Sequence, residues 1–141
     1  MDLVIKLNEF FPGVSFLGTR AAGEKIREVM EKVFNDNNTV VLDFDGIENI
    51  TQGFGDEILG IFTRTHGKKF IKQNIKAVNY GESIKTVLNW VVSYSEEYQK
   101  NLKAFKYIVN EYPELITDEQ IRILKAIVLK DNINKEVNSN E

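Results

Sequence analysis

The chain has 141 residues, of which 43% are hydrophobic and 28% charged, and its formal net charge is -3; this composition is typical of an ordinary globular domain with one core and excludes a disordered or fibrous chain. It has no cysteine and a single histidine, His66, which excludes disulfides, thiolate metal sites, thiol nucleophiles and any chemistry that needs a histidine pair. No apolar run approaches the ~20 residues of a membrane span, so we expect a cytoplasmic protein without membrane association, metal or cofactor.

The first part of the sequence predicts two strands and a helix. Apolar residues alternate over residues 3–7, which predicts a strand with one buried face. A Pro-Gly turn separates this strand from a second short apolar stretch, residues 14–17, so we expect a β-hairpin. Apolar residues then recur with helical spacing over residues 22–34, and Thr19 is placed to cap that helix.

The middle of the sequence repeats the order of strand, loop and helix. The apolar run 40–44 predicts a buried strand, which we expect to be parallel to its predecessor because a helix connects them. Helical spacing resumes over residues 54–62 and ends at Gly67, and residues 75–78 predict a further strand. The sequence therefore predicts an α/β fold over this part of the chain.

The last part of the sequence is predicted to be helical. A heptad-like series over residues 84–112 has one polar member, Ser95. A continuous helix of about 30 residues would be roughly 45 Å long, longer than a domain of this size is wide. We therefore expect it to project from the domain or to break near residues 93–95. A capping-box spacing predicts a final helix over residues 117–130.

The sharpest local motif is Asp43-Phe44-Asp45-Gly46, at the carboxyl end of the predicted buried strand. Two carboxylates there can hold Mg²⁺ while one attacks a phosphoryl group, and the motif is similar to that of haloacid-dehalogenase-type phosphatases. That family has a hydroxyl or small residue where Ile47 stands and draws its partner groups from a longer chain. The alternatives are a phosphatase-like enzyme centred on Asp43, or a turn at Asp45-Gly46 with Asp43 capping or pairing locally.

The run from Val40 to Gly60, VVLDFDGIENITQGFGDEILG, resembles a STAS-like family of prokaryotic proteins. The family pattern is a strand ending in Asp-Phe, an Ile-Thr pair, and a helix start of the form Phe-x-Asp-Glu-aliphatic. The stretches GTRAAGEKI and KAVNYGESIKTVL fit the same family, so the resemblance covers about residues 3–92. It implies the STAS fold of anti-sigma-factor antagonists and sulfate-transporter tails, a mixed sheet packed with helices that works by binding partners.

The resemblance also implies where a partner binds and how binding is regulated. In the antagonists, a partner kinase phosphorylates a serine at the start of the helix after the central strand, and that position is Gly53 in this chain. Thr51 is then a displaced candidate phosphoacceptor. The implied partner-binding surface is the loop and helix start, comprising Thr51, Gln52, Gly53, Asp56 and Glu57.

Within that surface, we expect the acids Asp56 and Glu57 to be exposed and to carry recognition. Gly53 and Gly55 are expected to leave the backbone approachable, and Phe54 is assigned to the core. The alternative for the two acids is that they only complement the dipole of the helix start.

A second candidate surface is basic. Residues 64–76 carry five positive charges and no acid, which predicts a basic patch of Arg64, Lys68, Lys69 and Lys72. Such a patch can neutralise phosphates, so a nucleic-acid-associated accessory protein is a further alternative. The net charge of -3 argues against it, and lysines around a helix end also occur as a solvated rim.

The long helical stripe predicts self-association, because the small domain and the final helix together are too short to cover it. We expect a homodimer with these candidate interface residues: Val91, Tyr98, Leu102, Phe105 and Val109.

Taken together, the sequence predicts a STAS-like α/β domain over residues 1–92, a helical C-terminal extension over 93–132 and a disordered tail over 133–141. The leading function is a non-enzymatic regulatory protein-interaction module similar to an anti-sigma-factor antagonist, but without the usual phosphoacceptor serine. The implied partner is a kinase-like anti-sigma ATPase.

Overall fold

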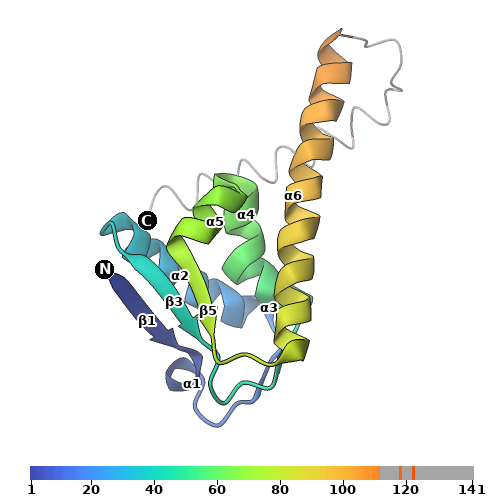
Figure 1. The fold of residues 1–141 in the computed structure, drawn as a ribbon. Helices are drawn as coiled ribbons and strands as arrows, with labels where there is room; N and C mark the ends of the chain where they lie inside the picture. Colours follow the sequence, from blue (N-terminus) through green and yellow to red (C-terminus); the bar gives the residue numbers. More distant parts are fainter. Residues whose placement is uncertain (112–117, 119–121, 123–141) are drawn as a thin grey trace. The chain divides into compact units, whose positions relative to one another are not determined.

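The computed structural model describes residues 1–111, 118 and 122 and has small parallel sheets and several helices (Figure 1). The α/β class predicted from the sequence is confirmed. The chain divides into two compact units, Met1–Glu96 and Glu97–Glu141, and every described strand belongs to the first.

Three parallel strands form the main sheet in the order β1 (Asp2–Lys6), β3 (Thr39–Asp43) and β5 (Ile75–Val78). Side chains alternate between the two faces of the sheet, as a period of two requires. The buried face packs against helices and carries Ile5, Val40, Leu42 and Ile75. Figure 1 shows α2 behind this sheet. The opposite face includes the exposed side chains of Val4 and Lys76.

The predicted hairpin is wrong. Leu7–Phe10 forms a short helix, α1, which ends the first strand. β2 (Phe16–Leu17) then pairs in parallel with β4 (Asn49–Ile50) in a separate two-stranded sheet. The described strand pairs are thus parallel, where a mixed sheet was expected, because helical connections carry the chain back to the same end of each sheet before the next strand starts.

The helix α2 (Arg20–Asn35) forms where the apolar spacing predicts it. Thr19 caps it, since its Oγ1 accepts a hydrogen bond from Ala22 N–H at 3.1 Å. Ile26 and Met30 are fully buried on its inner face. The prediction of both the helix and its cap is confirmed.

Residues 52–66 form one helical run in three parts: α3 (Gln52–Gly55), a π-helical turn, η1 (Asp56–Gly60), and α4 (Ile61–His66). Gly67 ends it with φ of +91°, a backbone conformation that favours glycine. A further helix, α5 (Lys68–Asn74), leads into β5. α5 was not predicted from the sequence, because its two apolar residues lie among basic residues and give no clear period.

The helix α6 (Glu82–Glu111) runs without interruption over 30 residues, so the break considered near residues 93–95 does not occur. The predicted final helix, 117–130, and the predicted tail, 133–141, lie outside the described residues apart from Asp118 and Arg122. None of the helices in the described part of the chain is long and apolar enough to cross a membrane.

Candidate partner-binding surface

The predicted surface lies at the start of α3, directly after β4. Thr51 is the N-cap of α3, and its Oγ1 accepts a hydrogen bond from Phe54 N–H at 3.1 Å. Phe54 is fully buried, which confirms its assignment to the core. The hydroxyl considered as a displaced phosphoacceptor therefore already satisfies one of the free N–H groups of the helix start.

Gly53, at the position that corresponds to the phosphoserine of the antagonists, is partly covered by Arg20. A Cβ placed on Gly53 would lie 3.1 Å from Arg20 Cγ and 3.6 Å from its Nε. The Arg20 side chain is itself 60% exposed. The position that the resemblance implies for the phosphoacceptor thus has no side chain, and Arg20 lies across its backbone.

Two carboxylates anchor Arg20 from the other side. Asp56 Oδ2 accepts a hydrogen bond from Arg20 Nη1 at 2.8 Å, and Glu57 Oε1 lies 3.6 Å from the same nitrogen. The hydrogen bond with Asp56 raises the pKa of Arg20. Arg20 is therefore held in place over Gly53 by charge-assisted bonds.

Asp56 also binds a second arginine. Arg64 Nη1 donates to Asp56 Oδ1 at 2.7 Å and to the Ser95 hydroxyl at 3.0 Å. Burial alone would raise the pKa of Asp56, but the hydrogen bonds from Arg64 and Arg20 outweigh it and hold that pKa below its ordinary value. Ser95, the one polar member of the helical stripe, is fully buried as the acceptor for this arginine.

Glu57 is held by α2. Arg27 Nε donates to Glu57 Oε2 at 2.9 Å, and Arg27 Nη1 donates to Glu31 at 2.9 Å. All three residues are buried. Burial disfavours the charged guanidinium, yet its bonds to Glu57 and Glu31 raise the pKa of Arg27 overall. We call these six charged residues the arginine–carboxylate cluster: Arg20, Arg27, Glu31, Asp56, Glu57 and Arg64.

The expected exposure of Asp56 and Glu57 is therefore wrong. Both carboxylates belong to the π-helical turn and face arginines of α2 and α4 instead of solvent. Close packing enforces this: a Cβ on Gly23 of α2 would lie 2.7 Å from Glu57 Cβ, and a Cβ on Gly60 would collide with Asp56 Oδ1. π-helical turns are found frequently at functional sites, and this one aims two adjacent acids into the interior.

The remaining residues of the predicted surface divide between exposed and covered. Gln52 is exposed, and Thr51 and Gly53 are half-buried. Gly55 is buried, because Val87 and Val91 of α6 pack against it. The prediction that its backbone is accessible is therefore wrong. The surface open to a partner is thus the first turn of α3 together with Arg20.

One residue of the predicted basic patch, Arg64, is not part of an exposed basic surface. Arg64 points into the arginine–carboxylate cluster, because its side chain bonds Asp56 and Ser95. Lys68 lies 3.6 Å from Glu96, and Lys69 and Lys72 are exposed on α5. The patch therefore consists of three lysines on one short helix, one of them next to an acid.

Asp43 is hydrogen-bonded to neighbouring residues, as expected if it has a structural role in the turn. Its Oδ1 accepts hydrogen bonds from Asn79 Nδ2 and from Asp45 N–H, each at 2.9 Å. The bond from Asn79, followed by that from Asp45, lowers the pKa of Asp43. The Asp43 carboxylate thereby closes the turn after β3 and connects this turn to the residue that follows β5. In the described part of the chain, no group of three or more histidine or acidic side chains is placed to hold a metal.

The predicted dimer-interface residues have different environments. Val91 is 1% exposed and packs against the helical run 52–66, so it is not available as an interface residue. Tyr98 and Leu102 lie on α6 beyond Glu96, and the side chains of Phe105 and Val109 lie outside the described part of the structure.

Arg20, Arg27 and Glu31 were not predicted as site residues from the sequence. A signal for two of them exists: Arg27 and Glu31 are four residues apart and adjacent to the buried positions Ile26 and Met30. Charged residues this close to the apolar stripe of an amphipathic helix indicate a buried ion pair. Arg20 carries no comparable signal.

The chain combines parallel strands, backed by helices, with a capped helix start after β4. Residues 22–85 match the family model described as "STAS-like domain of unknown function (DUF4325)". The resemblance noted in the sequence is confirmed over that range. No curated protein and no solved structure is significantly similar to the chain.

Proposed function

We propose that this chain is a non-enzymatic regulatory module that binds a partner protein through the first turn of α3 and Arg20. The observation that supports the proposal is the placement of Arg20 over Gly53, next to the region 22–85 that matches the STAS-like family model. Arginine is among the residues that dominate protein interfaces, and here its guanidinium is fixed by Asp56 while most of the side chain stays exposed. The two acids act by positioning Arg20.

The proposed module works without a phosphorylation switch at the family position. Phosphorylation adds about two negative charges to a hydroxyl, and Gly53 has no hydroxyl to accept them. Thr51 has one, but it caps α3. A permanently positive Arg20 beside Gly53 instead favours a partner surface with a carboxylate, whose affinity does not change with phosphorylation.

The proposed partner class rests on the resemblance to the anti-sigma-factor antagonists. A kinase-like anti-sigma ATPase is the partner that the resemblance to the antagonists implies, and we propose an ATPase of this type for this chain. Residues Thr51, Gln52 and Gly53 would form the contact, and Arg20 would contribute the charge.

The test is a binding titration of the purified chain against the anti-sigma-type ATPases of its host, by calorimetry. We expect one of them to bind, and Gln52→Arg, which adds bulk and charge at the exposed first position of α3, to weaken binding by about tenfold or more. Lys32→Glu is the matched control: Lys32 is exposed on the last turn of α2, far along that helix from Arg20. Absence of binding to every such ATPase, or equal affinities for Gln52→Arg and wild type, would contradict the proposal.

A further inference from the structure

The strand β1 is an open edge of the main sheet. Among the described strands, β3 pairs with one side of β1 and none pairs with the other. Two of the three apolar side chains at its centre are not buried, since Val4 is 56% exposed and Leu3 36% exposed, whereas Ile5 belongs to the core. An exposed edge strand with an apolar centre is a template for pairing with another strand.

The backbone of β1 offers its hydrogen-bonding groups at alternate residues. Met1 O accepts from Thr39 N–H at 3.0 Å, so Met1 faces β3. Backbone groups alternate sides along a strand, and the register continues from Asp2 to Lys6 without a bulge. The backbone N–H groups of Asp2, Val4 and Lys6 therefore point away from β3, and their side chains share the open face of the sheet.

We propose that β1 pairs antiparallel with β1 of a second copy of this chain, with Val4 opposite Val4. In this register a two-fold axis passes beside Val4, and Asp2 of each copy lies opposite Lys6 of the other. The sequence Asp2-Leu3-Val4-Ile5-Lys6 is thus complementary in charge to itself only in the antiparallel direction. A parallel pairing in register would set Asp2 against Asp2, which is destabilising.

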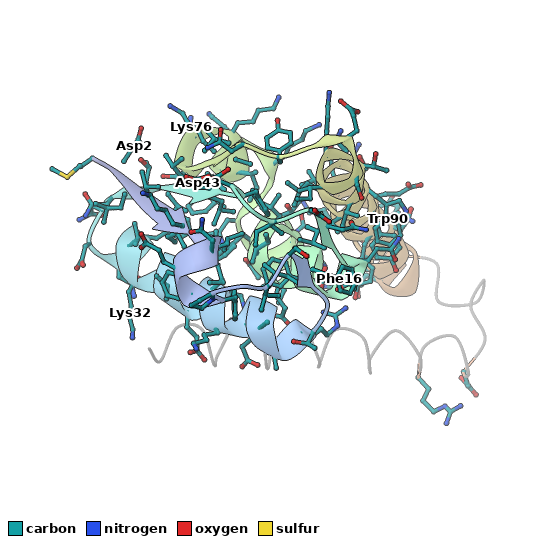
Figure 2. The ribbon with its side chains drawn as sticks, turned by 90° about the horizontal axis from the view of Figure 1, so that it is seen from below. Asp2, Phe16, Lys32, Asp43, Lys76 and Trp90 are labelled. Atoms are coloured by element: carbon teal, nitrogen blue, oxygen red, sulfur yellow. The ribbon has the colours of Figure 1, made fainter. Side chains whose placement is uncertain are left out.

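The neighbours of these charges within one copy are compatible with the pairing. Asp2 lies 3.7 Å from Lys76, both side chains being more than half exposed, and it also accepts a hydrogen bond from Thr39. Lys6 lies opposite Asp43 in the sheet. Figure 2 shows Asp2, Asp43 and Lys76 on one side of the strands and Lys32 of α2 on the other. A carboxylate has about four acceptor sites, so Asp2 can bind Lys6 of the second copy as well.

The strength of such a dimer is limited by the length of the strand. β1 has five residues, and interfaces below about 1,200 Å² belong to weak, transient complexes. We therefore expect an association that is detectable at high micromolar concentration and sensitive to salt, because two exposed ion pairs set its register. This inference is independent of the function proposed for the α3 surface.

The test is sedimentation velocity of the full chain from about 5 µM to about 500 µM, a range suited to weak interfaces. We expect the sedimentation coefficient of the wild type to rise with concentration. Val4→Pro removes one N–H that points outward, which an edge strand tolerates, and should abolish the rise. Val4→Thr, the matched control, keeps both the N–H and the β-branched shape and should retain it.

Charge reversal tests the register without relying on proline. Lys6→Asp sets like charges against each other and should weaken the dimer about fivefold or more, whereas the double variant Asp2→Lys/Lys6→Asp should return to within about twofold of the wild type. A monomer at all concentrations, or a double variant no better than the single one, would overturn the proposal. Dissociation by Leu102→Glu but not by Val4→Pro would place the interface on α6 instead and would also overturn it.

Discussion

The arginine–carboxylate cluster makes a strong prediction for the conservative substitution Asp56→Asn. The change preserves the shape of the side chain but removes the negative charge between Arg20 and Arg64. The amide has one acceptor oxygen, so it can serve only one of the two guanidinium groups, while its NH₂ faces the other. The result is excess positive charge in a largely buried position.

The magnitude follows from the burial of this pair. The side chains of Asp56 and Arg64 are each 16% exposed, so this ion pair is closer to a buried pair than to a surface pair. Removal of one partner of a buried pair costs about 3–5 kcal/mol, whereas a surface pair contributes about 0–1 kcal/mol. The amide retains one hydrogen bond, worth about 1 kcal/mol. We expect Asp56→Asn to lower the free energy of unfolding by about 2–4 kcal/mol.

The assay is urea denaturation followed by the fluorescence of Trp90, the single tryptophan, which lies in the first unit. Asp45→Asn is the matched control, because Asp45 is an exposed carboxylate in the turn after β3, and it should change the stability by less than about 0.5 kcal/mol. A loss of stability for Asp56→Asn no larger than that of Asp45→Asn would refute the role assigned to the cluster.

The same pair of variants gives a pH dependence with a defined sign. The pKa of Asp56 in the folded protein lies below its ordinary value of 3.8, so the unfolded chain binds a proton first as the pH falls. The stabilisation is complete well above pH 3.8 and is lost as the pH falls through that value toward the folded pKa. Between about pH 5 and pH 3, Asp56→Asn should therefore lose less stability than the wild type or Asp45→Asn.

Three further outcomes are expected. Thr51→Ala should lower the free energy of unfolding by about 1 kcal/mol, because it removes the N-cap of α3, whereas Thr51→Asn keeps a capping oxygen and should cost less than half of that; equal losses in urea denaturation would contradict the cap. The purified chain should release no phosphate from aryl phosphates with Mg²⁺, because Asp43 closes a turn, and turnover that disappears in Asp43→Asn would overturn this. Nucleic-acid binding measured by fluorescence anisotropy should be weak and lost with rising salt. Tight binding at physiological salt would instead favour the accessory-protein alternative, if it is abolished by changing Lys68, Lys69 and Lys72 to Glu.

Much of the fold could be predicted because its elements have clear periodicity. α2 has both an apolar stripe and a capping threonine, and β3 is a continuous apolar run between polar turns. The false hairpin shows the limit of such patterns. The spacing of residues 3–7 and 14–17 is the same for an antiparallel pair as for two strands in different sheets. The long-range pairing of β2 with β4 decides between them.

The candidate surface was predicted from the resemblance and from the glycines and acids of the local sequence, but the ion pairs of Asp56 and Glu57 were not predicted. Asp56 and Glu57 stand out as acids beside glycines at a helix start, yet their partners Arg20 and Arg27 are 36 and 30 residues away. Both acids lie in the π-helical turn, where Glu57 is in tight contact with Gly23 of α2. Local patterns thus predicted the helix start, and the long-range ion pairs determine which of its side chains are exposed.

The most direct test of the proposed function is whether phosphorylation changes partner affinity. The chain purified from its native host would be analysed by intact mass and titrated against the anti-sigma-type ATPase that binds it, before and after phosphatase treatment. We expect no phosphoryl adduct and dissociation constants that agree within about twofold. A phosphoryl adduct on the chain, together with a change in affinity of about tenfold or more after phosphatase treatment, would contradict this expectation.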